Sequence, residues 1–355
     1  MSAVKINDLE YLETETKIRV LLTGAGGSIG VHVLDHIMLN TDWEVVCLDS
    51  YRHKGYFDRV SQTLDHNPHW RKRIISITHD LTAPISYREA ETIGKIDYVI
   101  NLASLADVWD SVANPAPFIR NNTELMLTMM EYVREYPVKA FIQFSTDEVY
   151  GPADKNQGWG EWSPMVPSNP YSASKAAQEM IGISYWRSYG VPLIITNTMN
   201  NFGQFQGSSK YPVIIQKKLM ADEEITVHAA SDGQIGTRYY IHSRNVADAV
   251  LFILNKLPPH MHEPGQVDRP DKYNIVGDAQ VDNLEMAKTI ARLMNKELKY
   301  KLVDFHSKEP GHDLHYGLDG SKLEKLGWKS PTSFEKSMKD TIDWQLANPR
   351  WIAEK

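Results

Sequence analysis

The sequence predicts an α/β protein with a doubly wound parallel sheet and a smaller mixed α/β lobe in its C-terminal part. Up to about residue 200, short apolar runs typical of buried strands alternate with segments of helical periodicity. A glycine-rich segment directly follows the first apolar run, as in a strand–turn–helix unit. After residue 200 the alternation becomes irregular, which indicates a second lobe that closes over the ligand-binding edge of the sheet.

Six strands are expected before residue 200, because each is a short apolar run bounded by turn residues. They span residues 17–22, 43–49, 74–77, 97–103, 140–144 and 192–196. Two long helices are expected at 118–135 and 171–188, where apolar side chains recur at helical spacing. The methionine-rich patch of the first helix is interpreted as packing, which could include a second subunit.

Composition places the chain among ordinary globular proteins, with 355 residues, of which 42% are hydrophobic and 23% charged. A net charge of −7 without a basic stripe argues against nucleic acid as a partner. The sequence contains neither an apolar run of membrane-spanning length nor the apolar core of a signal peptide, so no membrane association is expected. Cys47 is the single cysteine, so it cannot form an internal disulfide, and its apolar neighbours predict a buried, inert thiol. We therefore expect a reducing, cytoplasmic compartment.

The glycine-rich segment 23–30 predicts a cradle for a dinucleotide. Glycine removes the side chain where the backbone meets a pyrophosphate, and the N-terminus of the following helix favours the anion. About twenty residues later Asp49 ends the second strand, where it would bind the adenosine ribose hydroxyls and repel a 2′-phosphate. NAD is therefore favoured over NADP, although Arg52 is close enough to affect that preference. The alternative is an ordinary turn followed by an incidental aspartate.

The residues expected to contact NAD lie in this turn and after the second, third and fourth strands. They are Gly24, Gly27, Ser28, Ile29, Gly30, Asp49, Asp80, Leu81, Leu102 and Ala103. Asp80 and Leu81 would meet the adenine, although an aspartate in a loop after a strand is commonly structural.

The chain is accordingly divided into three parts. Residues 1–16 form an N-terminal extension, and residues 17–200 form an NAD-binding domain of the Rossmann type. Residues 201–355 form mainly the second lobe, from which segments around 240–275 are expected to return to the first domain.

Two adjacent carboxylic acids, Asp147 and Glu148, follow an apolar strand together with the hydroxyl of Thr146. This places them at the carboxyl end of a strand, where ligands bind in parallel α/β sheets. Tyr171 and Lys175 come one helical turn apart, and a nearby cation pushes a tyrosine towards phenolate. Either pair alone is common on loops and helix surfaces. Their combination with the glycine-rich turn indicates that these five residues are catalytic.

Histidines give no indication of a metal site. The pairs His66/His69 and His260/His262 lie beside prolines in expected surface loops. Neither pair has a cysteine or carboxylate partner at the spacing of a ligand set, so no metal is expected.

With these features the chain resembles the extended short-chain dehydrogenase/reductase superfamily, and within it the nucleotide-sugar 4,6-dehydratases of the dTDP-glucose 4,6-dehydratase type. The resemblance covers about residues 17–345. It is most specific at residues 145–151, 167–175, 196–203 and 310–313. The adjacent Asp-Glu pair is its most diagnostic feature, because relatives that epimerise or decarboxylate usually lack it.

The resemblance implies NAD-dependent dehydration of a nucleotide diphosphate hexose to a 4-keto-6-deoxy sugar. In this scheme Tyr171, its pKa lowered by Lys175 and the nicotinamide charge, takes the 4-hydroxyl proton while a hydride passes from C4 to NAD. Glu148 then removes the C5 proton, protonated Asp147 donates to the departing C6 hydroxyl, and the hydride returns to C6. Thr146 would bind the 4-oxygen, and Tyr171 and Lys175 would also contact NAD. The residues themselves indicate only that one of two adjacent carboxyls can act as the acid and the other as the base.

The resemblance also implies that Asn200, Lys210, Arg238 and Asn274 bind the nucleotide diphosphate sugar. A cation such as Arg238 suits a pyrophosphate. Alternatively, Lys210 and Arg238 are solvated surface charges, and Asn274 caps a strand end.

Two segments depart from the family pattern. Residues 104–111 carry apolar side chains at positions that are usually polar, and Asp107 stands where the family has histidine. Around 309–315 the usual arginines are replaced by Glu309, Leu314 and His315. We therefore expect a substrate other than dTDP-glucose.

Other functions remain open from the sequence. Another C4-oxidising nucleotide-sugar enzyme, such as an epimerase, a decarboxylase or a 5,6-dehydratase, would use a similar site. A non-catalytic NAD-binding protein is a further alternative, but it would have no use for the full catalytic set. From the resemblance, a homodimer is expected through the helices at 118–135 and 171–188.

Overall fold

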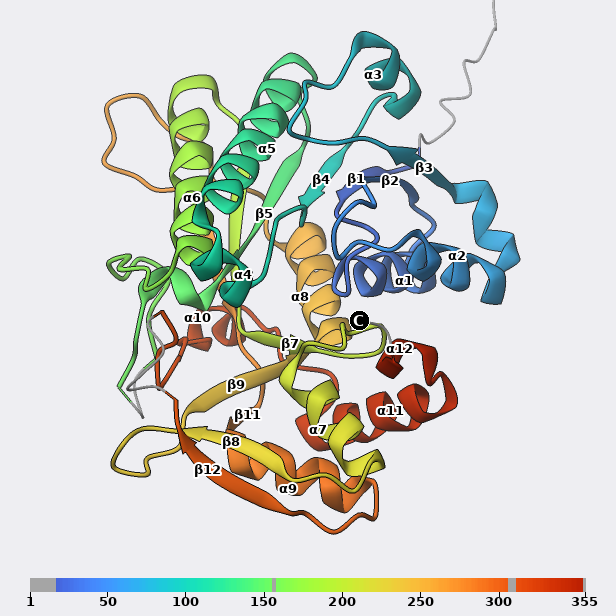
Figure 1. Ribbon diagram of the computed structural model, residues 1–355. Helices are drawn as coiled ribbons and strands as arrows, with labels where there is room; N and C mark the ends of the chain where they lie inside the picture. The colour runs from blue at the N-terminus through green and yellow to red at the C-terminus, as the bar shows by residue number, and fades with distance from the viewer. Residues whose placement is uncertain (1–16, 155–157, 306–310, 354–355) are drawn as a thin grey trace, which may run out of the picture.

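The computed structural model describes residues 17–154, 158–305 and 311–353. They form an upper and a lower lobe in the view of Figure 1. The upper lobe is built on a seven-stranded sheet, and the lower lobe contains two small sheets of three and two strands. The expected extension 1–16 lies outside the described residues.

All pairings in the large sheet are parallel, in the order β10-β6-β5-β4-β1-β2-β3. The strands are β1 Arg19–Thr23, β2 Glu44–Asp49, β3 Ile74–Thr78, β4 Tyr98–Asn101, β5 Ala140–Thr146, β6 Leu193–Thr198 and β10 Asp271–Ile275. The chain runs outward from β1 to β3 and then returns to the other side of β1 with β4. The predicted doubly wound sheet is confirmed, and the carboxyl ends of β1 and β4 flank the switch point where such sheets bind ligands.

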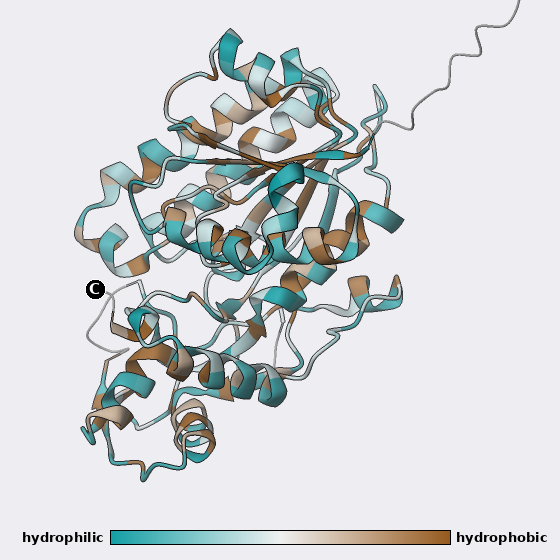
Figure 2. Ribbon diagram, turned by 90° about the vertical axis from the view of Figure 1, so that its right-hand side faces the viewer, coloured by the Kyte–Doolittle hydropathy of each residue, from teal (hydrophilic) through white to brown (hydrophobic). Residues whose placement is uncertain are grey.

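Helices cover both faces of this sheet, whose apolar strands are brown between the helices in Figure 2. One face carries α1 Gly30–Asn40, α2 Phe57–His66 and α8 Ser243–Lys256, and the other carries α3 Tyr87–Ile93, α5 Pro115–Glu135 and α6 Pro170–Tyr189. Each layer buries its apolar side chains in a core of its own. Met126, Met129 and Met130 of α5 belong to the second core, which confirms that the methionine-rich patch serves packing.

The bounds of β4 differ from the prediction for a physical reason. The strand ends at Asn101, because the next two residues turn towards β1: Leu102 N donates to Thr23 O at 3.4 Å, and Ala103 N donates to Thr23 Oγ1 at 3.2 Å. Before β5, four short elements were not predicted, namely α2, α3, η1 Pro68–Arg73 and α4 Val108–Ala113.

The lower lobe is mixed α/β, as expected. Its sheets pair β11 Ala279–Asp282, β9 Thr237–His242 and β7 Asn200–Phe202, and β12 Tyr300–Asp304 with β8 Ile225–Ala229. Its helices are α7 Tyr211–Met220, α9 Asn283–Leu293, α11 Phe334–Ala347 and α12 Arg350–Ala353. The short helix α10 Ser321–Lys325 instead buries Leu323 in a core of the upper lobe. A third core joins α7, α9 and α11 to these sheets. Since α8 and β10 belong to the upper lobe, the chain crosses between the lobes more than once, and a boundary at residue 200 stays a prediction.

An ion pair closed to solvent joins β10 to α6 behind the end of β5. Lys272 Nζ lies 2.6 Å from Glu179 Oε2, and both side chains have no exposed surface. Glu179 also accepts from Ser145 Oγ at 2.5 Å and from Asn197 Nδ2 at 3.1 Å. Taking both charges out of water costs folding free energy, which the attraction between the two charges offsets. Removal of either partner would leave the other as an uncompensated buried charge.

We expect Lys272→Met to lower the free energy of unfolding by about 3–5 kcal/mol, because Glu179 would remain as a buried charge without its cation. Urea unfolding followed by circular dichroism measures this loss. The matched control is Lys272→Met combined with Glu179→Gln, which removes the charge and keeps hydrogen-bonding atoms. The double variant should recover most of the loss, and a double variant as unstable as the single one would contradict the assignment.

Candidate active site

The glycine-rich turn between β1 and α1 has room only for glycine at two positions. Gly24 has a φ of 69°, and a Cβ there would lie 2.8 Å from Ala103 N. A Cβ on Gly30 would lie 2.1 Å from Gly24 O. Ile29, after Ser28, forms the N-cap of α1, an 11-residue helix, so the turn brings backbone to the positive end of a helix dipole. These residues fit the pyrophosphate of a dinucleotide.

Asp49 is held at this turn by two backbone donors. Its carboxylate accepts from Gly26 N and Tyr51 N, both at 2.9 Å. It therefore lies at the end of β2 where the sequence predicts a contact with the adenosine ribose. Arg52, the residue that could have favoured a 2′-phosphate, forms an ion pair with Asp80. This pairing leaves Asp49 as the charge that bears on cofactor choice.

The other expected cofactor residues divide into two groups. Leu102 and Ala103 lie against Gly24, while Gly27 N donates to Gly24 O at 3.0 Å. Leu81 is buried in the core on the α5–α6 face. The Asp80 carboxylate accepts from the backbone and the hydroxyl of Thr82, which fits the structural alternative for that residue.

The carboxyl pair lies where β5 passes into the 3-10 helix η2 Asp147–Tyr150. Thr146 Oγ1 donates to Asp147 Oδ1 at 3.0 Å and accepts from Glu148 N at 3.4 Å. Asn169, the N-cap of α6, donates through Nδ2 to Glu148 Oε2 at 3.0 Å. One hydroxyl and one amide therefore orient the two carboxyls.

Burial changes the acidity of both groups. The Asp147 side chain is 4% exposed, and burial first, then the charge of Glu148, raises its pKa to about 7. Burial also raises the pKa of Glu148, although the Asn169 hydrogen bond and the charges of Arg238 and Lys210 oppose this. Asp147 can thus hold a proton near neutral pH and release it without a large free-energy change, as a general acid requires.

Tyr171 begins α6 beside the carboxyl pair. Burial, followed by the charges of Glu148 and Asp147, raises its pKa, and a hydrogen bond with Thr146 lowers it only in part. This differs from the expectation that Lys175 would lower the pKa of Tyr171. Burial and the two carboxylates decide the direction of this shift, so Tyr171 holds its proton at neutral pH until positive charge approaches.

Lys175 is directed into a buried hydrogen-bond network. Its Nζ donates to Gln178 Oε1 at 2.6 Å, and burial lowers the pKa of its ammonium to about 7. Gln143 Nε2 donates to the same Gln178 oxygen at 3.1 Å, Asn101 Nδ2 donates to Gln143 Oε1 at 2.7 Å, and Thr23 Oγ1 donates to Asn101 Oδ1 at 2.6 Å. The network connects the catalytic helix to the start of the glycine-rich turn.

Arg238 lies on β9 and faces the site, but most of its contacts hold a neighbouring segment. It donates to the carbonyl oxygens of Asp313 and Leu314, each at 2.7 Å, and its guanidinium lies 4.4 Å from the Tyr316 ring centroid. Ser168 Oγ donates to Asp313 Oδ2 at 2.7 Å, so the same segment also contacts the loop before α6. Arg238 therefore positions one wall of the site in addition to supplying charge.

The remaining expected substrate residues differ in their placement. Asn200 is partly buried on β7, and Lys210 is exposed before α7 with its charge acting on Glu148. Asn274 is fully buried, and its amide donates to the carbonyl oxygens of Trp159 at 2.9 Å and Asp319 at 3.0 Å. This placement fits the alternative that Asn274 holds a strand end.

The described residues give no metal centre. Asp268 accepts from both His260, at 3.2 Å, and His262, at 2.6 Å, so a carboxylate partner missing from the sequence pattern is present in space. Even so, within residues 17–154, 158–305 and 311–353 no group of three or more His, Cys, Asp or Glu side chains is arranged to hold a metal ion. In the same part of the chain, every helix is too short or too polar to cross a membrane.

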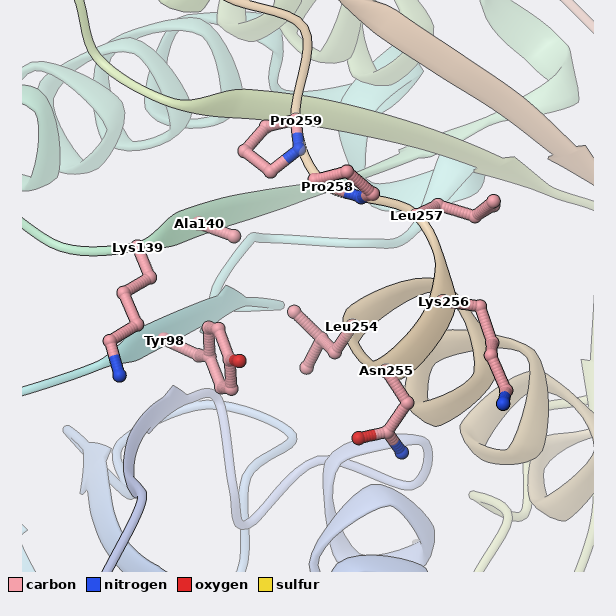
Figure 3. Close-up of a pocket in the computed structure, with 9 residues that line it drawn as sticks. All are labelled: Tyr98, Lys139, Ala140, Leu254, Asn255, Lys256, Leu257, Pro258 and Pro259. Carbon is pink, nitrogen blue, oxygen red and sulfur yellow. The ribbon is translucent and has the colours of Figure 1, made fainter. Parts of the chain in front are cut away.

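A pocket at the opposite edge of the sheet is separate from these residues. Figure 3 shows it beside Tyr98 and Ala140, the first residues of β4 and β5, with Pro258 and Pro259 above them. It therefore lies at the amino ends of the strands, whereas the carboxyl pair and the glycine-rich turn lie at the carboxyl ends. Lys139, on its rim, is ion-paired with Asp97 at 2.8 Å.

The model of the GDP-mannose 4,6 dehydratase family matches residues 21–341. The chain belongs to this family. It is 30% identical to a dTDP-glucose 4,6-dehydratase of Haemophilus influenzae, over 93% of this chain and 98% of that protein. It is also 30% identical, over 94% of its length, to a trifunctional UDP-glucose 4,6-dehydratase/epimerase/reductase of Arabidopsis thaliana. The chain spans about half of the length of that relative, 48%.

Solved structures agree with this placement. A dTDP-glucose 4,6-dehydratase from Streptomyces venezuelae, crystallised with NAD, superposes with a TM-score of 0.80 at 25% identity, covering 94% of this chain and 98% of that one. A UDP-glucuronic acid 4-epimerase from Bacillus cereus reaches the same TM-score at 20% identity, over 93% of this chain and 100% of that one, and shows the shared fold alone. The predicted resemblance to nucleotide-sugar 4,6-dehydratases of the extended short-chain dehydrogenase/reductase type is confirmed.

The segment around α4 contains Asp107, where the resemblance implies a histidine. Lys54 Nζ lies 2.5 Å from Asp107 Oδ2 and 3.2 Å from Asp110 Oδ2, so the unusual Asp107 meets a cation from the loop after β2. Trp109 is exposed and lies 5.5 Å from the ring of Phe305 and 4.8 Å from that of His312, centroid to centroid. The ring of Trp109 on α4 thus packs against aromatic rings from the segment that follows β12.

Sequence reasoning missed two residues that position the catalytic set. Asn169 caps α6 and orients Glu148, and Gln178 binds the Lys175 ammonium. A sequence signal existed for Asn169, because an asparagine directly before Pro170 at a helix start is a typical N-cap. Gln178 had no such signal, since a glutamine three residues after Lys175 is unremarkable without the fold.

The raised pKa of Asp147 makes a prediction for stability. A carboxyl with a pKa near 7 when folded and 3.8 as its ordinary value binds more protons in the folded state, so it costs stability as the pH rises through that window. We expect Asp147→Asn to gain about 1–3 kcal/mol relative to the wild type between pH 5 and pH 8. Urea unfolding at several pH values measures it, with Asp340→Asn on the exposed face of α11 as control. A difference independent of pH would contradict the assignment.

Proposed function

We propose that the protein is an NAD-dependent nucleotide-sugar 4,6-dehydratase, which converts a nucleotide diphosphate hexose to a 4-keto-6-deoxy sugar. The observation that carries this proposal is the pair formed by buried Asp147 and half-buried Glu148 beside Tyr171 at the carboxyl edge of the sheet. Removal of water from C5 and C6 needs a base and an acid on neighbouring atoms, and this pair supplies both. Membership of the dehydratase family and the similarity to enzymes with this activity support it.

The residues take the following roles in the proposal. Tyr171 accepts the proton of the 4-hydroxyl, with Thr146 bonded to the same oxygen. Glu148 removes the C5 proton once the 4-ketone has acidified it, and Asp147 donates its proton to the 6-hydroxyl, which leaves as water. Glu148 then gives a proton back to C5 as C6 becomes a methyl group. Lys175 supports Tyr171 from the same helix. The chemistry that NAD supplies when bound is the reversible uptake of a hydride, together with a positive charge that favours the Tyr171 phenolate.

NAD would be held by the glycine-rich turn and by Asp49 at the end of β2. The substrate's charged part would meet Lys210 and Arg238, and Asn200 lies on the adjoining strand β7. Because the segment with Asp107 differs from the family pattern, we infer a substrate other than dTDP-glucose. The carboxyl pair favours dehydration over epimerisation, since inverting C4 needs no acid and base for C5 and C6.

The compartment and the assembly are part of the proposal. We place the enzyme in the cytoplasm, which the buried Cys47 thiol suits because burial raises the thiol pKa and so leaves it unreactive. We also infer a homodimer through α5 and α6, which lie side by side in Figure 1. Their outward faces carry exposed large apolar side chains, namely Ile119, Leu127, Met180 and Tyr189. Apolar side chains gathered on one surface favour association.

Mass spectrometry of the purified protein with NAD and a panel of dTDP-, UDP-, GDP- and CDP-hexoses tests the activity. We expect a product lighter than one substrate by the mass of water, and carrying solvent deuterium when made in D2O, because Glu148 exchanges the C5 proton. Tyr171→Phe should reduce turnover by about 10²–10⁴-fold, the usual contribution of general acid–base catalysis. An isomer of the substrate would support the epimerase instead, and loss of carbon dioxide the decarboxylase.

Leu127→Glu tests the dimer. A charge buried in the interface lacks its water, so dissociation should become at least about tenfold easier. Size-exclusion chromatography with light scattering measures the molar mass over a dilution series. Leu39→Glu, an exposed leucine on α1, is the matched control and should leave the molar mass unchanged. A wild-type monomer throughout the series would rule the dimer out.

A further inference from the structure

Arg59 on α2 is a buried cation that contacts the glycine-rich turn. Its side chain is 2% exposed. Nη1 donates to Gly26 O at 2.7 Å and to Lys54 O at 2.6 Å. The backbone of Tyr56 donates to the same Gly26 oxygen at 2.9 Å. A charge-assisted hydrogen bond to a buried carbonyl oxygen is stronger than a neutral one, so Arg59 fixes the direction of this peptide group.

The other side of Gly26 is fixed by Asp49. Gly26 N donates to Asp49 Oδ2 at 2.9 Å, so both the N–H and the carbonyl oxygen of this residue have a charged partner. The turn therefore cannot reorient its backbone at Gly26 without breaking one of these bonds. Backbone direction decides whether a turn presents N–H groups or carbonyl oxygens to a pyrophosphate.

The chain's C-terminal helix α12 covers Arg59. The Trp351 side chain is 1% exposed, and its ring centroid lies 5.5 Å from the Arg59 guanidinium. The Tyr56 ring lies 4.8 Å from the same guanidinium. Aromatic faces attract a cation that has lost its water, and this stabilises Arg59 in its buried position.

Trp351 is itself anchored to both lobes. Its Nε1 donates to Gln62 Oε1 on α2 at 3.2 Å, and Arg350 Nη2 donates to the same oxygen at 2.6 Å. Its ring lies 5.1 Å from that of Phe205, in the segment that leads from β7 to α7. Figure 1 shows α12 between the α1–α2 layer and α11. Helix α12 is thus connected through Arg59 to the glycine-rich turn after β1.

We propose that Arg59 and Trp351 form a clamp through which α12 holds the glycine-rich turn in its dinucleotide-binding conformation. Both are positioning residues, because they act on the cofactor site through the backbone of Gly26. The inference rests on the proposed function for the identity of the cofactor, and on the contacts of this chain for the clamp.

A double-mutant cycle tests the clamp, using NADH titrations followed by fluorescence. Arg59→Met and Trp351→Ala should each raise the Kd of NADH by about tenfold. The Kd of the double variant should be at most about twice that of either single variant, because both changes break the same chain of contacts. Trp351→Phe keeps an aromatic face and should retain most of the affinity. Single variants within twofold of the wild type, or effects that multiply in the double variant, would overturn the clamp.

Hydrogen exchange without added cofactor gives a readout that a general loss of stability would not reproduce. Exchange of the amides in residues 23–30 should become faster in Arg59→Met and Trp351→Ala. Trp186→Phe is the control, since Trp186 is fully buried on the other face of the sheet. It should lower the unfolding temperature while leaving NADH affinity and exchange in 23–30 unchanged.

These readouts separate the clamp from the proposed function. If the wild-type protein binds no NADH, the cofactor assignment fails, and exchange in residues 23–30 alone decides the clamp. If the wild type binds NADH and exchange in 23–30 is the same in all variants, the clamp fails and the proposed function stands.

Discussion

Two neighbouring carboxyl groups at the end of β5, one buried and one half-buried, set the conditions for the rest of the site. Asp147 and Glu148 cannot both be charged there at low cost, because burial and mutual repulsion act in the same direction. The surrounding structure responds with one hydroxyl from Thr146, one amide from Asn169 and a cation at some distance, Arg238. These contacts are enough to orient the two carboxyls but too few to hold both of them charged. The pKa of Asp147 therefore stays raised, and this carboxyl can bind and release a proton near neutral pH.

Two buried lysines lie next to the carboxyl pair, and each has a different kind of partner. Behind β5, Glu179 is neutralised by Lys272, a residue that reaches it from a strand added by the C-terminal half of the chain. In front, Lys175 is directed to Gln178. Burial lowers the pKa of the Lys175 ammonium, and the nearby charge of Glu179 opposes this only in part. The fold thereby separates Lys272 of β10, which neutralises a buried carboxylate, from Lys175 of α6, which lies one helical turn after Tyr171.

Much of this arrangement could be predicted from residues close together in sequence. The strand–turn–helix at 23–30, the acid at Asp49 and the catalytic candidates all depended on local patterns, and the fold places them at one edge. The pKa of Tyr171 could not be predicted, because it depends on which buried charges surround it in space. Asn274 shows the same limit, since an asparagine at a strand end serves a ligand or the backbone with equal ease, and here it donates to two carbonyl oxygens. Long-range partners such as Lys272 carry no mark in the sequence.

The amide of Asn169 has a consequence for how the site opens. Its Nδ2 donates at once to Glu148 Oε2, at 3.0 Å, and to Gly311 O, at 3.1 Å, so one nitrogen holds the base and the segment that forms a wall of the site. Because the hydrogen bond from Asn169 lowers the pKa of Glu148, a displacement of that wall that weakened this bond would make Glu148 hold its proton more tightly. Asn169 therefore couples the position of the wall to the protonation of the carboxyl beside it.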